Sequence, residues 1–106
     1  MAYERLVKKL TKENLWLYIL KLLKERSMYG KEIVKEVHRR FGFSPATITV
    51  YVALYKMERE GLIRKSKNIK GEGKVYYELT DKGRELFEKG RIFMKKMYKT
   101  LFEEEP

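Results

Sequence analysis

Hydrophobic residues recur at helical spacing along the first 41 residues of the chain. A short amphipathic segment from about residue 3 precedes Thr11, which we expect to cap the helix that follows. That helix, reaching about residue 26, is apolar around most of its circumference, which is typical of a helix in the middle of a fold. Ser27 is expected to cap a further helix that Gly42 ends. This part of the chain therefore predicts three consecutive helical segments.

A second stop and start signal follows at Ser44-Pro45, where a capping hydroxyl precedes a proline suited to the first helical position. The helix predicted from there reaches Glu60, and Gly61 is expected to end it in a left-handed conformation. Its core row contains Val50, Ala53, Leu54 and Met57, which share one side of a helix.

The pattern changes after Gly61. Leu62 and Ile63 begin one predicted strand and residues 75–79 form another, with a basic hairpin turn over residues 67–73. Thr80 or Asp81 is expected to begin a last helix that reaches about residue 103. The order of helix, helix-turn-helix, β-hairpin and helix predicts a mainly α winged helix-turn-helix fold with a small β-hairpin and a long C-terminal helix. We expect residues 1–80 to form a DNA-binding unit with an N-terminal helical extension, and residues 81–106 a dimerisation helix.

Charge narrows the range of partners. The 106 residues contain 25 Lys and Arg against 15 Asp and Glu, a net charge of +10 that favours a polyanion such as nucleic acid. The absence of cysteine excludes disulfides and thiolate metal sites. Neither a signal peptide nor an apolar run long enough to span a membrane is present, so we expect a cytoplasmic protein that does not enter membranes. Abundant Lys and Glu with few amides follow the trend of thermophile proteins.

Three local patterns resemble the PadR-like transcriptional regulators over about residues 15–85. Residues 28–33 (Met-Tyr-Gly-Lys-Glu-Ile) are similar to the opening of the family's second helix. Residues 49–51 (Thr-Val-Tyr) with 60–63 (Glu-Gly-Leu-Ile) resemble its recognition helix. Residues 76–84 (Tyr-Tyr-Glu-Leu-Thr-Asp-Lys-Gly-Arg) resemble its second wing strand and the turn into the last helix, and are the most specific of the three. Two positions depart from the family pattern, because Lys31 stands where an aromatic residue is common and Tyr55 where a basic residue is common.

The resemblance implies a homodimeric repressor that binds double-stranded DNA through the start of the second helix, the third helix and the wing. The residues expected to contact DNA are Tyr29, Lys31, Ser44, Thr47, Thr49, Tyr51, Lys56, Lys67, Lys70 and Lys74. The resemblance also implies a small-molecule effector of unknown identity, since some relatives sense aromatic compounds at the dimer interface. The single tryptophan, Trp16, lies outside the last helix, so no stacking residue is carried over.

The last helix carries an apolar stripe that a lone surface helix would leave in water. Its members are Leu86, Phe87, Gly90, Phe93, Met94, Met97 and Leu101, at spacings of three and four. Burial against a second copy in a two-fold interface explains the stripe and is our prediction. Packing against Trp16 of the same chain is the alternative, and both arrangements can hold at once.

Several exposed positions keep two interpretations. Tyr51 can touch DNA or pack against the wing. The apolar stripe of Ile48, Val52 and Tyr55 can contact thymine methyl groups or pack under another element, and we favour packing for Tyr55. Lys31 can bind phosphate or pair with a local glutamate.

Catalytic chemistry is not predicted. His38 is the only histidine and has no carboxylate near it in sequence, so neither a general base nor a metal site is expected, and no cofactor. The chain is therefore expected to be a regulator rather than an enzyme. Two other classes remain open, a basic protein that coats DNA without sequence preference and a winged helix that binds a protein.

Overall fold

A computed structural model describes residues 1–66 and 73–103. It is mostly helical, in the order α1 (Ala2–Leu10), a 3₁₀ turn (Lys12–Asn14), α2 (Leu15–Glu25), β1 (Met28–Tyr29), α3 (Gly30–Phe41), α4 (Thr47–Arg59), β2 (Ile63–Lys65), β3 (Tyr76–Leu79) and α5 (Asp81–Tyr98). A π-helical turn (Lys99–Glu103) continues α5. The mainly α winged-helix prediction is confirmed. We call the hairpin of β2 and β3 the wing.

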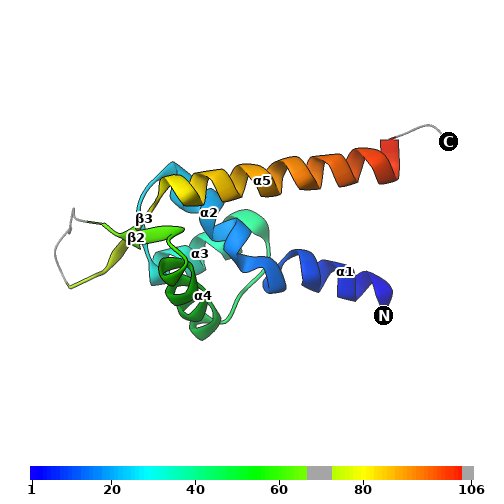
Figure 1. Cartoon of the computed structure of the whole chain (residues 1–106). Coiled ribbons are helices and arrows are strands. Elements are labelled where there is room, and N and C mark those ends of the chain that lie inside the picture. Colours follow the sequence, from blue (N-terminus) through cyan, green and yellow to red (C-terminus); the bar gives the residue numbers. More distant parts are fainter. Residues whose placement is uncertain (67–72, 104–106) are drawn as a thin grey trace.

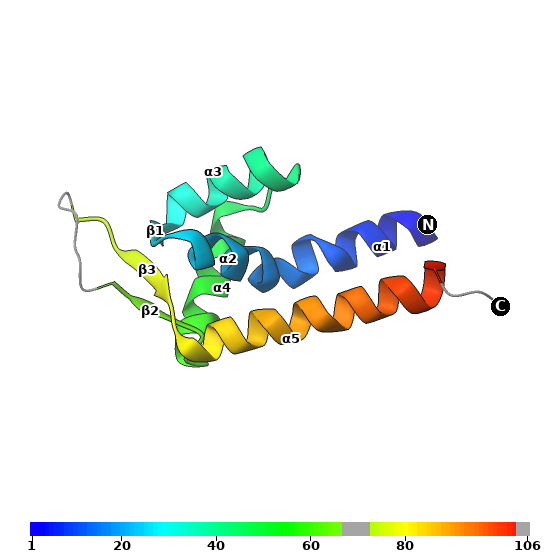
Figure 2. The same cartoon turned by 90° about the horizontal axis from the view of Figure 1, so that it is seen from above.

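The first helix, α1, and the last helix, α5, project from the same side of the domain (Figures 1 and 2). In Figures 1 and 2, α1 and α5 both extend to the side opposite the wing, and the N-terminus lies there. The central helix α2 packs against α3, α4, α5 and β3, and its residues Ile19, Leu20 and Leu22 are fully buried. This placement confirms the expectation that the most apolar helix lies in the middle of the fold.

A third strand was not expected from the sequence. The three strands form an antiparallel sheet in the order β1-β3-β2, in which Met28 pairs with Tyr77 and Tyr29 with Tyr76. Because residues 28 and 29 are extended, α3 begins after Tyr29, and the prediction that Ser27 caps it is wrong. The side chain of Glu32 instead accepts a hydrogen bond from the backbone N–H of Tyr29 at 3.4 Å.

Two other helix starts differ from the prediction. Thr11 does not cap α2, because its hydroxyl donates to the carbonyl of Val7 at 2.6 Å and so closes the end of α1. Likewise α4 begins at Thr47 rather than at Pro45, since the Ser44 hydroxyl lies 2.7 Å from Nδ1 of His38 and caps nothing.

The predicted helix ends are confirmed. Gly42 ends α3 and Gly61 follows the end of α4, both at a φ of 77°, which only glycine adopts without strain. Thr80 caps α5, since its hydroxyl accepts the N–H of Gly83 at 3.0 Å. The helices therefore begin and end at turns that orient α4 and the wing.

An ion pair ties α2 to α3 on the surface. Arg40 donates to both carboxylate oxygens of Glu25, at 2.5 and 2.9 Å, and this pairing lowers the pKa of Glu25 from its ordinary value near 4.5 to about 2. A carboxyl group whose pKa falls on folding stabilises the protein above its unfolded pKa, and that stability is lost as the pH drops toward the folded pKa.

We therefore expect Arg40→Met to lower the free energy of unfolding at pH 7, with the difference from the parent closing between pH 4.5 and pH 2. Urea unfolding at a series of pH values measures this difference. Lys35→Met is the matched control, because Lys35 is exposed on the same helix and takes part in no ion pair among the described residues. A parent–variant difference that stays constant down to pH 2 would contradict the assignment.

Candidate nucleic-acid interface

The recognition-helix candidate α4 has one buried side and one open side. Val50, Leu54 and Met57 are buried against the body, while the opposite side faces water. Figure 1 shows α4 at the lower edge of the molecule, where no other element covers it. A groove-binding helix needs such a free face.

The wing and the start of α3 meet beside α4. The rings of Tyr29 and Tyr76 pack edge to face with centroids 5.3 Å apart, and the Lys74 ammonium lies 4.6 Å from the centroid of Tyr29. With Tyr51 of α4, these elements line a shallow hollow of about 370 Å³. Burial raises the pKa of Tyr77 at its edge, so that phenol stays protonated and can donate a hydrogen bond.

Tyr51 rests on Gly30. A Cβ atom at Gly30 would lie 2.5 to 2.6 Å from three atoms of the Tyr51 ring and phenol, so only glycine permits this contact. The ring nevertheless keeps 42% of its surface exposed. Tyr51 therefore packs on the start of α3, where the sequence had offered the wing, and its exposed face keeps contact with DNA as a prediction.

Basic side chains surround this surface. Glu32 pairs with Arg26 at 2.8 Å and Glu36 with Arg39 at 2.7 Å. In residues 1–66 and 73–103, Lys31, Lys35 and Lys56 take part in no ion pair, and the glutamates near Lys31 and Lys35 are engaged by arginines. The local pairing considered for Lys31 is therefore absent, and its ammonium group is available to an external anion.

The other residues expected to contact DNA are spread around α4. Thr47 and Thr49 are exposed in its first turn, whereas Ser44 is exposed but engaged with His38. Lys67 and Lys70 lie outside the described residues. On the wing strands, Arg64 pairs with Glu78 at 2.7 Å, so this cation is partly neutralised.

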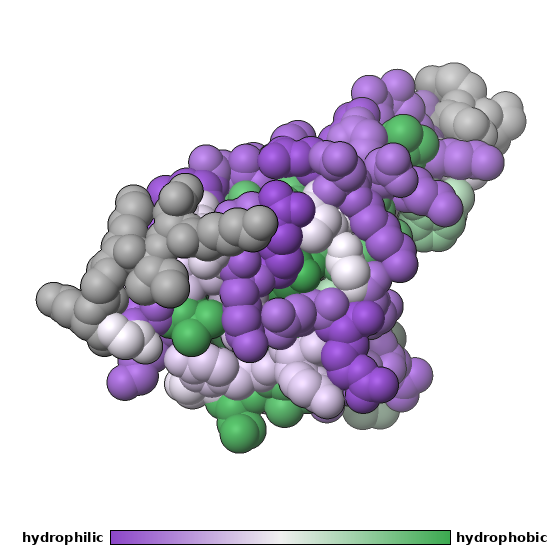
Figure 3. All heavy atoms as spheres, turned by 60° about the vertical axis from the view of Figure 1, so that its left-hand side comes forward, coloured by the Kyte–Doolittle hydropathy of each residue, from purple (hydrophilic) through white to green (hydrophobic). Residues whose placement is uncertain are grey.

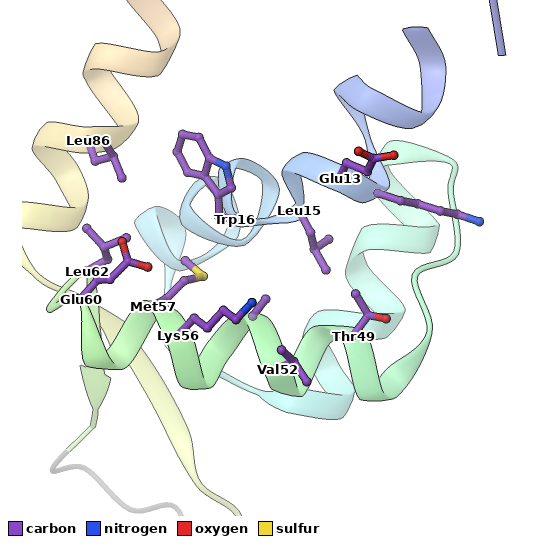
Figure 4. A pocket seen from close by; sticks show the side chains of 12 residues that line it. Glu13, Leu15, Trp16, Thr49, Val52, Lys56, Met57, Glu60, Leu62 and Leu86 are labelled. Atoms are coloured by element: carbon purple, nitrogen blue, oxygen red, sulfur yellow. The ribbon is translucent and has the colours of Figure 1, made fainter. Parts of the chain in front are cut away.

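Thr49 and Lys56 lie along a groove beside α4. The groove of about 440 Å³ runs between α2, α4 and α5, and Figure 4 shows Trp16 and Leu86 on its opposite wall. Apolar side chains form most of the lining, and four charged residues complete it, namely Lys12, Glu13, Lys56 and Glu60. Thr49 therefore lies at the side of α4 that faces this groove rather than on its outermost line.

The outermost line of α4 is apolar and was left out of the predicted contacts. Ile48, Val52 and Tyr55 keep 72%, 46% and 60% of their surfaces exposed. The packing favoured for Tyr55 is wrong, because most of its surface is exposed, with the Arg59 guanidinium 5.7 Å from the ring centroid. Their helical spacing opposite the core row is the sequence signal for this exposure, and contact of these residues with DNA stays a prediction.

The stripe on the last helix divides into two parts. Leu86 and Phe87 pack on the core of their own chain, and Gly90 lies against Leu17 and Trp16 of α2. Beyond Gly90 the stripe opens to solvent, with Phe93 62%, Met94 42% and Leu101 69% exposed, while Met97 is half-buried. Intrachain packing thus accounts for the first half of the stripe and leaves the second half uncovered.

In the described part of the chain, neither a cluster of metal ligands nor a helix that could span a membrane is found. No three His, Asp or Glu side chains there are grouped so that they could hold a metal ion. Among the described helices, none combines the length and the apolar character needed to cross a membrane.

A family profile and a solved structure with 32% identity indicate one family. The profile of the transcriptional regulator PadR-like family matches residues 19–89, whereas no curated protein matches the chain. A solved PadR family transcription regulator from Clostridium difficile R20291 is 32% identical, with 80% of this chain and 94% of that chain covered and a TM-score of 0.67. Bacillus subtilis PadR in complex with operator DNA is 26% identical over 87% of this chain and 49% of that chain, with a TM-score of 0.63. A transcriptional regulator from Clostridium thermocellum shares the fold at 23% identity, 85% and 93% coverage and a TM-score of 0.73.

Proposed function

Because this chain belongs to the PadR-like family of transcriptional regulators, we propose that it is a homodimeric repressor of transcription that binds a specific double-stranded DNA site. The family consists of regulators rather than enzymes. The structure of Bacillus subtilis PadR with operator DNA supports duplex DNA as the partner of this related chain.

The observation that carries the proposal is the free face of α4 between the start of α3 and the wing. In the proposed complex this face enters the major groove, which is wide enough to admit a helix. Lys31 and Lys74 flank it from α3 and from the wing, where cations can contact the phosphate backbone and fix the register of the helix. Tyr51, which packs on Gly30, joins α4 to the start of α3.

The proposed dimer buries the distal half of α5. Phe93, Met94 and Leu101 form an apolar surface that a second copy can cover in a two-fold interface. The exposed apolar side of α1, with Tyr3, Leu6, Val7 and Leu10, extends in the same direction and can contribute to it.

A two-fold dimer would present two α4 helices to half-sites about one helical turn apart, and occupancy of a promoter would block transcription. An effector of unknown identity would act by changing the spacing of these helices.

Fluorescence anisotropy with two duplexes at two salt concentrations tests the proposal. One duplex is the DNA upstream of the protein's own gene, because repressors of this kind often control themselves, and the other is a scrambled duplex of equal length. We expect a preference of about 10³ or more for one site, which persists at the higher salt concentration. Size-exclusion chromatography with light scattering is expected to give twice the mass of the chain.

Other binding results would favour one of the two competing functions, a DNA-coating protein or a winged helix that binds a protein. Equal binding to both duplexes, and to a pool of random duplexes, that falls together as salt rises would identify a DNA-coating protein. Absence of binding to any duplex at low salt would contradict DNA recognition and favour a winged helix that binds a protein.

A further inference from the structure

The outermost line of α4 is unusual for a helix that enters a charged groove, because it is made of hydrocarbon. Ile48, Val52 and Tyr55 lie at spacings of four and three, opposite the buried row of Val50, Leu54 and Met57. Figure 3 shows hydrophobic atoms at the lower edge of the molecule, where α4 lies. We call Ile48, Val52 and Tyr55 the apolar line.

The apolar line begins in the first turn of α4. Ile48 is the second residue of the helix, and 72% of its surface is exposed. Val52 follows one turn later with 46% exposed, and no acidic residue occurs in α4 before Glu58. Within α4 itself, a polyanion therefore meets no carboxylate along the line before Glu58, whereas Glu13 and Glu60 lie in the groove beside Val52.

The charges around the line show which partner it suits. Lys31, Lys56 and Arg59 are exposed around it, and none of them is paired with a carboxylate in the described residues. An apolar protein partner would leave these cations without a counter-charge. The major groove of DNA supplies both kinds of group, since phosphates flank it and thymine carries an apolar C5-methyl group on its floor.

We propose that Ile48 and Val52 recognise thymine C5-methyl groups in each half-site, and that this apolar contact makes T·A pairs preferred at those positions. The inference rests on the proposed function and specifies what the α4 face reads. Tyr55 and the Arg59 guanidinium above it lie at the far end of the line, where the cation is placed to reach a phosphate at the groove edge. Direct hydrogen bonds to bases are left to Thr47, Thr49 and Tyr51.

The test removes single methyl groups from the DNA. A duplex is first selected from a random pool by repeated binding to the parent protein, and each thymine of the enriched site is then replaced by deoxyuridine. Deoxyuridine pairs as thymine does and lacks only the C5-methyl group. Burial of one methyl group corresponds to about a fourfold change in affinity, so we expect about a fourfold loss at each contacted thymine.

Protein variants assign the methyl groups to residues. With Ile48→Ala, the deoxyuridine replacement that affects its thymine is expected to cost less than about twofold, and Val52→Ala is expected to do the same at a different thymine. Both side chains are exposed, so the variants should fold, which circular dichroism verifies. Ile92→Ala is the matched control, because Ile92 is 56% exposed on α5, away from α4, and should retain the full sensitivity to deoxyuridine.

The outcomes separate this inference from the proposed function. Specific binding that no deoxyuridine replacement weakens would overturn the inference and leave the repressor proposal intact. If Ile48→Ala and Val52→Ala both lose as much affinity on deoxyuridine replacement as the parent does, the inference is also overturned, because other residues would then contact the methyl groups. Failure to enrich or bind any duplex would instead refute the proposed function, and would assign the apolar line to a protein partner.

Discussion

Phe93→Lys is expected to convert the protein from a dimer into a monomer. Phe93 keeps 62% of its surface exposed on α5, beyond the part of the stripe that packs on the chain's own core. Burying one phenylalanine contributes about 1.5 to 3 kcal/mol, and the two-fold interface contains two copies. The dimer dissociation constant should therefore rise by a factor of about 10² to 10⁴, which analytical ultracentrifugation measures.

The same substitution should weaken DNA binding without touching the DNA-contacting surface. Two linked half-site contacts gain about 10² to 10⁴ in affinity from their connection, and a monomer loses that gain. Ile92→Lys is the control, since it introduces the same charge at the neighbouring residue, which is 56% exposed and lies off the stripe. A dimer that survives Phe93→Lys and dissociates with Ile92→Lys would place the interface on another side of α5.

Gly83→Ala is expected to destabilise the fold itself. A Cβ atom at Gly83 would lie 2.2 Å from the carbonyl oxygen of Leu62 and 2.8 Å from Cδ1 of Leu79. That carbonyl also accepts the backbone N–H of Thr80 at 3.1 Å and the Thr80 hydroxyl at 2.9 Å, so it cannot move without loss of these bonds. Overpacking of this kind costs about 3 kcal/mol, which lowers Tm by about 10 to 20 °C in a domain of this size.

Calorimetry at a fixed protein concentration measures this loss, because Tm depends on concentration when a protein associates. Gly90→Ala in the same helix is the matched control. Its Cβ would lie 3.2 Å from Cδ1 of Leu17, the end of a flexible side chain, and alanine favours the helix by about 1 kcal/mol. A Tm for Gly83→Ala equal to that of Gly90→Ala would refute the steric argument.

Gly83 also explains why a threonine and a glycine occur in the family pattern of residues 76–84. In residues 76–84 the threonine caps α5 and the glycine lets the helix lie on Leu62, at the junction of α4 and the wing. A larger residue at position 83 would push α5 away from this junction. Thr80 and Gly83 of this pattern thus serve the close approach of a helix to a backbone carbonyl.

The helices and their order could be predicted because each carries its own signal. The helical period of α2 to α5, the glycines at 42 and 61 and the threonine at 80 act over a few neighbouring residues. The helix starts were predicted less well at Ser27 and Ser44. A serine signals a cap only when no other partner competes for it, and His38 competes for Ser44.

The sequence by itself determined the winged-helix order, the basic character and the apolar line on α4, since periodicity and composition are local properties of the chain. Only the tertiary structure decided which partners those residues meet. Strand β1 is two residues long, too short for a period, and exists because the edge of β3 is available to it. Likewise Tyr51 rests on Gly30, and the α5 stripe divides at Gly90, which lies against α2, whereas Phe93 and Met94 beyond it are exposed. Such contacts join residues far apart in the chain, and their distances depend on how the helices pack.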